Sequence, residues 1–408
     1  MNKDIVFIVS EFPLVSQTFV VSNVVAAIKK GYDVQVLTSQ LHAVAESAQK
    51  DIISTYKILD KTSCFTEPIK KKERYTLAFR YLLNPKTAYY FIKYAFLKKR
   101  KISLSDIFLI NYYKPYRKAK VIHVHFADAA TFITRLKKIG FLKSKMMITF
   151  HGYDAYFKNE KEQKGLRDKY KILFEVSDKV TINTPYLKEK VASLGCPSAI
   201  LETIPVGIHT TYYKPTMYPK EIPSRNSRIN LLSIGRLIEL KGHRYGILAV
   251  KELVNKGYHP HYTIIGEGVL FQELTQLIKD LALEKNVLLY GKGTQEQVKE
   301  HLEQTAIFLM TSITNARGRE EAQGVVTIEA QSMGVPVVGF DSGGVSYTVP
   351  EKNNRLVPQK DVSRLVEKIE DLIADKKNYQ SMSIEARKWA VDRFDISHMI
   401  DNYYHNML

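Results

Sequence analysis

The sequence predicts an α/β protein with two domains, each built on a parallel β-sheet covered by helices. Three observations lead to this prediction. The chain has 408 residues, more than one hydrophobic core usually supports. Short β-branched runs alternate with helical patterns, as in parallel sheets. A polar segment with three prolines, 212–227, interrupts the alternation once and is typical of a linker.

The individual elements follow the same alternation. In the first domain we expect strands over 4–10, 34–38, 120–125, 145–150 and 179–183, with a helix over 18–30 that ends before Gly31. In the second we expect strands over 229–234, 262–265, 287–290, 307–310 and 336–340. Domain limits of 1–211 and 228–385 follow, and a C-terminal helix over 386–408 that could return to the first domain. Ligands of such sheets bind beyond the carboxyl ends of the strands.

The composition indicates an ordinary globular protein of the cytoplasm. The apolar fraction is 45%, and the two cysteines, Cys64 and Cys196, are too few for a disulfide framework. The apolar run at the N-terminus ends at Glu11, so it predicts a first strand rather than a signal peptide. No apolar stretch reaches the roughly 18 residues that a membrane span needs.

Several common binding motifs are missing from the sequence. There is no phosphate-binding G-x-x-x-x-G-K-[ST] loop and no D-x-D pair to hold a metal. Gly266 and Gly268 begin a dinucleotide fingerprint, but Phe271 occupies the place of its third glycine. His123 and His125 share one strand face and could bind a metal, yet no further ligand has suitable spacing. We interpret them as a polar strand end at the cleft.

The second domain opens with LLSIGRLIELKGH, in which a strand ends at Gly235. Arg236 and Lys241 then lie in a loop at the carboxyl end of that strand. Two fixed cations there suit a diphosphate, and they could stabilise the charge that develops when a bond to it breaks. The alternative is a solvated loop in a lysine-rich protein.

A second pattern, GREEAQGVVTIEAQSMGVPVV, contains Glu321 and Glu329 eight residues apart. Gly324 is predicted to open a helix that runs to about Met333. The amides of a helix N-terminus suit a phosphate or a sugar hydroxyl, and Glu329 could hold two ribose hydroxyls. The alternative is a capping carboxylate followed by a solvated helix face.

Taken together, these motifs resemble the retaining glycosyltransferases of the GT-B fold, in particular the large family four. The resemblance rests on Gly235 to Gly242, on the pair Glu321 and Glu329, and on the turn Ser342-Gly343-Gly344. In the first domain TFHGYD at 149–154 matches the H-G element of that family. The segment SEFPLVSQTFV at 10–20 is similar to members that build bacterial exopolysaccharides of the colanic-acid type.

The resemblance implies two Rossmann-like domains whose sheets face a central cleft, the first binding the acceptor and the second the nucleotide sugar. It implies the following roles: His151 and Glu321 as catalytic residues; Gly235, Arg236, Lys241, Gly324, Val325 and Glu329 as donor-binding residues; Ser16 and Gln17 as acceptor-binding residues. No metal or other cofactor is expected. The implied reaction transfers a hexose with retention, the leaving phosphate helping to deprotonate the acceptor hydroxyl.

Some residues depart from the pattern of the family. Ala322 stands where many members have glycine, and Glu320 competes with Glu321 as first member of the pair, although only Glu321 gives the eight-residue step. Gln323 is expected to alter the contacts to the donor sugar.

The net charge of +18 predicts an anionic partner. Residues 61–120 hold sixteen lysines and arginines against three acids, with aromatic residues interleaved. This mixture is typical of a surface that docks on anionic lipid. We expect the segment to rest on the inner face of the membrane and to present the enzyme to a lipid-linked saccharide acceptor. The alternative is a solvated basic face whose aromatic residues pack into the first domain.

Two other functions are compatible with the sequence. One is a nucleotide-sugar epimerase of the same fold, which needs no acceptor. The other is a basic nucleic-acid-binding protein, although no known nucleic-acid module is present and we expect no nucleic-acid partner.

Overall fold

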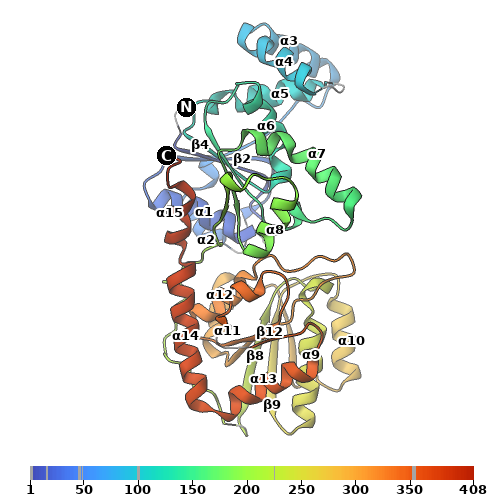
Figure 1. Ribbon diagram of the computed structural model, residues 1–408, viewed down its shortest axis with the longest axis vertical. Coiled ribbons are helices and arrows are strands. Elements are labelled where there is room, and N and C mark those ends of the chain that lie inside the picture. Colours follow the sequence, from blue (N-terminus) through green and yellow to red (C-terminus); the bar gives the residue numbers. More distant parts are fainter. Residues whose placement is uncertain are drawn as a thin grey trace. The chain divides into compact units, whose positions relative to one another are not determined.

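A computed structural model describes residues 3–14, 17–44, 47, 49–98, 102–224, 226–351 and 355–408. By its internal contacts the chain divides into two units (Figure 1). Unit 1 comprises Met1–Asn183, Leu187–Ile204 and Ile400–Leu408, and unit 2 comprises Thr184–Tyr186 and Pro205–Met399. The segment predicted as a linker, 212–227, therefore lies within unit 2, where Tyr213, Lys220 and Ile222 are buried.

Unit 1 contains a parallel sheet whose strands lie in the order β3-β2-β1-β4-β5-β6-β7. The strands are β1 (Ile5–Phe12), β2 (Val34–Leu41), β3 (Thr62–Cys64), β4 (Val121–His125), β5 (Lys145–Thr149), β6 (Lys179–Ile182) and β7 (Leu201–Thr203). Ile5 of β1 is aligned with Val34 of β2 on one side and with Val121 of β4 on the other. The five predicted strands are confirmed, and the two short strands β3 and β7 extend the sheet at its edges.

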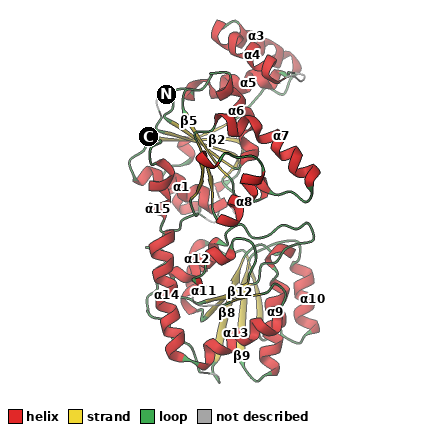
Figure 2. Ribbon diagram, in the orientation of Figure 1, coloured by secondary structure: helices red, strands yellow, loops and turns green. Residues whose placement is uncertain are grey.

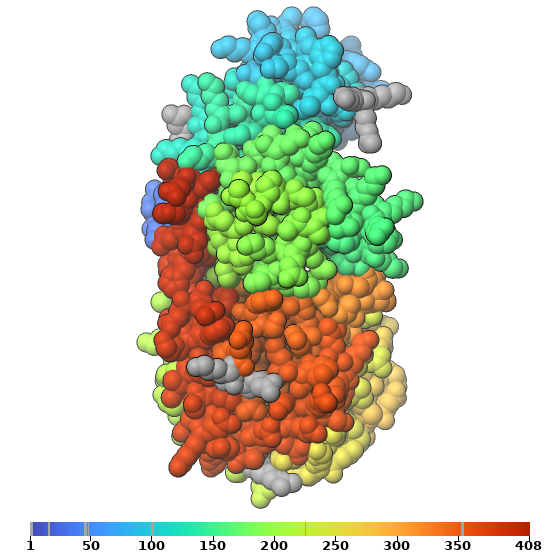
Figure 3. All heavy atoms as spheres, in the orientation of Figure 1, coloured from blue at the N-terminus to red at the C-terminus, as the bar shows by residue number. Residues whose placement is uncertain are grey.

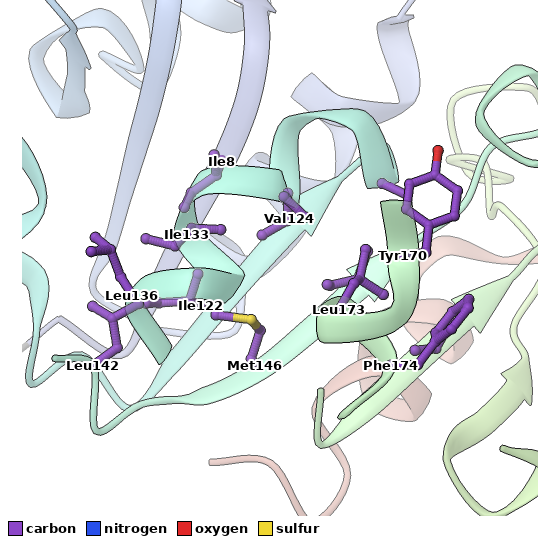
Figure 4. Close-up of a cluster of buried hydrophobic side chains, with 14 of the residues drawn as sticks. Ile8, Ile122, Val124, Ile133, Leu136, Leu142, Met146, Tyr170, Leu173 and Phe174 are labelled. Carbon is purple, nitrogen blue, oxygen red and sulfur yellow. The ribbon is translucent and has the colours of Figure 1, made fainter. Parts of the chain in front are cut away.

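Helices cover this sheet (Figure 2). They are α1 (Thr18–Lys29), α2 (Lys50–Thr55), α6 (Thr131–Lys138), α7 (Glu160–Val176), α8 (Pro185–Ser193) and α15 (Ile396–Tyr404). In the core, Ile133 and Leu136 of α6 belong to one cluster with Ile122 and Val124 of β4 (Figure 4). Each such side chain contributes about 1.5–3 kcal/mol by its burial.

Three helices between β3 and β4 form a helical insertion in unit 1: α3 (Lys71–Leu82), α4 (Pro85–Lys98) and α5 (Leu104–Tyr113). Ala78, Ile107 and Phe108 make a small core of their own, and Tyr94 and Tyr113 join the main core of unit 1. Figure 1 shows the insertion to one side of the unit-1 sheet. Within the described ranges no helix of the chain is both long and apolar enough to cross a membrane.

Unit 2 contains a second parallel sheet, in the order β10-β9-β8-β11-β12-β13. Its strands are β8 (Arg228–Ile234), β9 (His259–Ile265), β10 (Val287–Gly291), β11 (Ile307–Met310), β12 (Val337–Phe340) and β13 (Leu356–Val357). The five predicted strands are confirmed. Both sheets follow the Rossmann order, in which a strand order reversal between the first and fourth strands marks the place where ligands bind.

The helices of unit 2 are α9 (His243–Asn255), α10 (Phe271–Asp280), α11 (Gln295–Gln304), α12 (Val325–Ser332), α13 (Val362–Ala374) and α14 (Lys376–Phe394). After α14 the chain continues into α15, whose last residues belong to unit 1. There the Tyr404 hydroxyl lies 2.9 Å from Nδ1 of His123, and Lys30 donates to Asp401 at 2.6 Å. The end of the chain is thus part of the packing of the first sheet.

Candidate active site

In unit 2 the predicted cationic loop follows β8, next to the end of β11, at the reversal of strand order. The loop is closely packed: Gly242 has a φ of +60°, and a Cβ there would lie 2.0 Å from the Thr311 carbonyl oxygen. Gly266 approaches the loop from β9, and a Cβ on it would lie 1.9 Å from the Gly235 carbonyl oxygen. Only glycine fits at these two positions, so the glycines serve close backbone packing.

Lys241 and Glu321 meet in an ion pair with 2.5 Å between Nζ and Oε2, and Ser312 donates to the same oxygen at 3.4 Å. Burial raises the pKa of the Glu321 carboxyl, but Lys241, Ser312 and the charge of Arg236 outweigh burial and hold that pKa below its ordinary value. Glu321 is therefore a carboxylate at neutral pH, 80 residues along the chain from its cationic partner.

Arg236 leaves its guanidinium exposed beside this pair and makes no ion pair with any described residue. Its carbonyl oxygen lies 3.3 Å from Nε2 of His243. Burial, with help from the charge of Lys241, lowers the pKa of His243 to about 4, so this imidazole is neutral. His243 was not predicted from the sequence, although it directly follows the Lys241-Gly242 step.

The loop that carries Glu321 is held from behind by the Ser342–Gly344 turn. The Gly344 amide donates to the Glu321 carbonyl oxygen at 2.8 Å, and a Cβ on Gly343 would lie 2.3 Å from that oxygen. The Glu320 carboxylate has a different partner from that of Glu321: it accepts a hydrogen bond from Thr314 at 2.7 Å. The two neighbouring glutamates thus face different partners.

Gln323 is buried and does not face open space. Its amide accepts from the Val206 backbone N–H at 2.9 Å and donates to the Val206 carbonyl oxygen at 3.0 Å. Both halves of the amide are bonded to the backbone of Val206, so in this structure the Gln323 side chain is not available to contact a donor sugar. Its role in this structure is to hold the chain where unit 2 begins.

Gly324, which has a φ of +77°, is the N-cap of helix α12, and the amides of Val325 and Val326 have no acceptor within the helix. Glu329 lies half-buried near the middle of α12. Burial raises the pKa of its carboxyl to about 7, although a hydrogen bond with the buried Tyr213 hydroxyl partly opposes this. Glu329 is therefore a group whose charge changes near neutral pH.

The raised pKa of Glu329 predicts how the stability of the protein depends on pH. Between pH 4.5, the ordinary pKa, and about 7 the folded chain holds one more proton at Glu329 than the unfolded chain. The free energy of unfolding therefore falls as pH rises through this window. We expect Glu329→Gln to be more stable than the wild type by about 1–3 kcal/mol at pH 8 and nearly equal to it at pH 5, in thermal unfolding.

The control for this prediction is Glu300→Gln, because Glu300 is exposed on α11. It should change the melting temperature equally little at both pH values. An equal stability difference for Glu329→Gln at pH 5 and pH 8 would contradict the assigned cause.

In unit 1 His151 follows β5 and is half-buried between two rings. Its ring centroid lies 4.4 Å from that of Phe19 and 4.5 Å from that of Phe126. Asp154 shapes the backbone here by accepting from the amides of His151, Gly152 and Ala127 at 2.9–3.1 Å. Burial raises the pKa of Asp154 to about 6, while these amides oppose the rise.

Phe126 also marks this place as unusual. It has a φ of +69°, in the left-handed region that bulky residues rarely adopt. Such strain occurs mostly at functional sites, where the surrounding structure holds it in place. No sequence signal indicated Phe126, because backbone strain has no signature in residue type.

His123 and His125 are fully buried side chains of β4, whereas we expected a polar strand end at the cleft. His123 is bonded through Nδ1 to Tyr404 and through Nε2 to Thr149, 2.8 Å away. Nδ1 of His125 lies 3.0 Å from Nε2 of His151. Among the described residues, no group of three or more His, Cys, Asp or Glu is placed to hold a metal.

Of the two predicted acceptor-binding residues, Gln17 lies at the start of α1, two residues before Phe19. Its position brings it to the same strand-end region as His151. Ser16 lies outside the described residues.

Comparisons with known proteins match both halves of the chain. Residues 216–389 match the family model for glycosyl transferases group 1, and residues 16–212 match that for glycosyltransferase family 4. The two models together leave only short parts of the chain uncovered.

The chain is 27% identical over 370 residues to the putative colanic acid biosynthesis glycosyltransferase WcaL of Escherichia coli (strain K12), covering 89% of each chain. It is 28% identical over 368 residues to the amylovoran biosynthesis glycosyltransferase AmsK of Erwinia amylovora, covering 88% of each. Its fold is similar to that of Anabaena HepE, solved in complex with UDP and glucose, with a TM-score of 0.72 and 17% identity over 100% of this chain and 99% of that one. On the family matches, the motifs and the two Rossmann-type sheets, the chain belongs to the family 4 glycosyltransferases of the GT-B fold.

Proposed function

We propose that this glycosyltransferase transfers a hexose, with retention of configuration, from a nucleoside diphosphate sugar to a lipid-linked saccharide in the synthesis of a bacterial surface polysaccharide. The observation that carries the proposal is the Lys241–Glu321 ion pair beside the exposed Arg236, at the strand order reversal of unit 2. The names of the relatives, which include colanic acid and amylovoran synthesis, support the polysaccharide.

The residues of unit 2 suit the parts of such a donor. Arg236 and two free N–H groups of Lys241 would bind the diphosphate and stabilise the charge it gains on leaving. Glu321, paired with Lys241, would accept from hydroxyls of the hexose, and the α12 amides at Gly324 and Val325 would hold an oxygen nearby. Glu329 would accept from the ribose hydroxyls. Because these cations can supply the charge stabilisation, we expect no need for a divalent metal.

Glu329 gives a direct test of nucleotide binding. Glu329→Gln keeps the shape of the side chain but loses the charged acceptor, so we expect UDP or GDP to bind roughly tenfold or more weakly in calorimetric titrations at pH 8. The wild type should bind more tightly at pH 8 than at pH 6, because its carboxyl ionises near pH 7. Unchanged affinity in the variant at pH 8 would place the ribose elsewhere.

The helical insertion supports a lipid-linked acceptor. The three acids of residues 61–120, which include the insertion, are already paired, Glu67 with Arg74, Glu73 with Lys70 and Asp106 with Lys98. Five further cations, Lys71, Lys72, Arg80, Lys86 and Lys93, are exposed and make no ion pair with any residue in the described ranges. The surplus of positive charge on this surface is therefore available to an anionic partner.

Apolar side chains accompany these cations on the same helices. Tyr75 and Phe79 lie one turn apart on α3, and Ile92 and Phe96 lie one turn apart on α4; Phe79 is 67% exposed and Phe96 78%. Light-blue atoms of this insertion lie at the surface in Figure 3. Exposed aromatic residues among cations fit the boundary between lipid headgroups and acyl chains. We propose peripheral association with the inner face of the cell membrane through residues 61–120, of which 99–101 lie outside the described residues.

This surface predicts binding to lipid vesicles. We expect co-sedimentation that rises with the anionic lipid content and falls with salt, because exposed charges are screened. Removing Lys71, Lys72 or Arg80 should weaken binding roughly fivefold for each charge. Phe79→Ser with Phe96→Ser should weaken it at any salt concentration.

The matched control is Val269→Ser, since Val269 is an exposed apolar residue of unit 2 outside the insertion. It should bind vesicles as the wild type does. Equal, negligible binding of the wild type to neutral and anionic vesicles at low salt would contradict the membrane proposal and leave the donor proposal intact.

The experiment that tests the reaction is a panel of nucleotide sugars incubated with the purified protein, with and without EDTA. Slow release of nucleoside diphosphate from one donor, unchanged by EDTA, is the expected result, and NMR of the sugar first released reports its anomeric configuration. Conversion of a nucleotide sugar into its epimer without release would instead identify an epimerase. No turnover of any donor would contradict the proposed function.

A further inference from the structure

Three histidines of unit 1, His123, His125 and His151, form a continuous line from its C-terminal helix to the open side of His151. The ring centroids of His123 and His125 are 4.2 Å apart, and those of His125 and His151 are 5.3 Å apart. Within this line the two ring nitrogens of His123 are both used, by Tyr404 and Thr149. At His125 and His151 the possible positions of the ring protons are restricted by the contact between the two rings and by the burial of His125.

Both of these imidazoles are neutral at pH 7. Burial lowers the pKa of His125 to about 3, and burial together with His125 lowers the pKa of His151 well below its ordinary value. The titratable groups around them are the neutral His123 and the Asp154 carboxyl, which accepts from backbone amides. Each ring therefore carries one N–H, and the 3.0 Å contact between Nδ1 of His125 and Nε2 of His151 contains one of those protons.

Two arrangements of the protons satisfy that contact. If His151 donates, His125 must carry its own proton on Nε2, which is buried and has no partner among the described residues. If His125 donates through Nδ1, its buried Nε2 carries no proton, and only a lone pair is left without a partner. An unpaired buried N–H is rarer in proteins than an unpaired acceptor, and the Phe7 ring lies stacked on His125, out of reach of an N–H in the imidazole plane. The second arrangement is the one that these surroundings favour.

We propose that His125 is a positioning residue that donates to Nε2 of His151 and so fixes the proton of His151 on Nδ1. No described residue is bonded to that Nδ1, and His151 is only half-buried. His151 then offers its ligand an N–H donor and has no free lone pair, so it binds a substrate oxygen and does not take a proton from the acceptor hydroxyl. The link to sugar transfer rests on the proposed function, whereas the proton position does not.

The test is NMR of the full-length protein labelled with ¹⁵N-histidine, in which ring correlations identify the protonated nitrogen. The His151 signals are assigned by their loss in His151→Gln. We expect Nδ1 of His151 to carry the proton in the wild type. A proton on Nε2 of His151 in the wild type would overturn the proposal. This measurement needs no assay of activity.

Two variants at position 125 then test the cause. His125→Asn keeps an N–H donor at the place of Nδ1 and should keep the Nδ1–H form of His151. His125→Leu removes the donor and should give a mixture of both forms. An unchanged Nδ1–H form in His125→Leu would show that His125 does not set it.

The control for packing is the variant His123→Leu. His123 lies on β4 and is as buried as His125, but it has no hydrogen bond to His151. It should lower the melting temperature and leave the Nδ1–H form of His151 as it is. Loss of that form in His123→Leu would mean that ring packing, rather than the hydrogen bond from His125, sets the proton position.

Discussion

Arg236→Ala and Lys241→Ala are each expected to lower the rate of sugar transfer at least ~100-fold. A single preorganised group that stabilises developing charge contributes about 3 kcal/mol to the transition state. Arg236 is the cleaner test, because its guanidinium is exposed and its loss leaves no buried group unpaired. Lys241→Ala also leaves the Glu321 carboxylate without its cationic partner, so part of the effect of this variant will be on stability. The measurement is kcat/KM for the donor that the panel identifies.

Arg244→Ala is the matched control, since Arg244 is an exposed arginine only eight residues further on, with a weak contact to Glu273 at 3.9 Å. It should retain nearly full activity. Melting temperatures should show that Arg236→Ala is folded like the wild type. Nearly wild-type rates in both Arg236→Ala and Lys241→Ala would refute the diphosphate site.

Glu321→Gln should lower kcat about 100-fold, whereas Glu320→Gln should lower it only a few fold. The two changes remove the same charge from adjacent residues, but only Glu321 is paired with Lys241; Glu320 accepts from Thr314. In Glu321→Gln the charge-assisted hydrogen bond to Lys241 and the one proposed to the hexose would both be weakened, an effect of roughly 1.5–3 kcal/mol. Steady-state rates of the two variants, measured side by side, give the comparison.

The pair of variants also tests which glutamate begins the eight-residue motif. A larger loss of rate in Glu320→Gln than in Glu321→Gln would reverse that assignment. Equal small losses of rate in both variants would show that neither glutamate takes part in the reaction. The predictions for Arg236 would be unaffected.

The strands were predictable because burial on both faces of a parallel sheet requires apolar β-branched runs, which are visible in the sequence. The run at 229–234 became β8, and that at 307–310 became β11 with unchanged limits. Strand β13 was missed because it has only two residues, Leu356 and Val357, and so no periodicity. The same limit of length explains why β3 and β7 were missed.

The site was predictable only as far as residue types and spacing reveal it. The loop from Gly235 to Gly242 and the glutamate pair have fixed spacing, and resemblance to a family assigned them roles. The pairing of Gln323 with Val206 has no such spacing, since 117 residues separate the two, and it was missed. The hydrogen bond of His125 with His151 was missed for a related reason, because it depends on the alignment of β4 beside β5 rather than on a local pattern.

The return of the last residues to unit 1 has a consequence for how the protein is made. The ribosome synthesises β1 at the start of the chain and Tyr404 near its end, and domains generally fold from the N-terminus as they emerge. Until residues 401–404 have been synthesised, His123 lacks the hydroxyl that lies 2.9 Å from its Nδ1, and Lys30 lacks Asp401. Unit 1 therefore acquires its last helical residues only after all of unit 2 has been synthesised, and a fragment that stops at residue 204 would lack them.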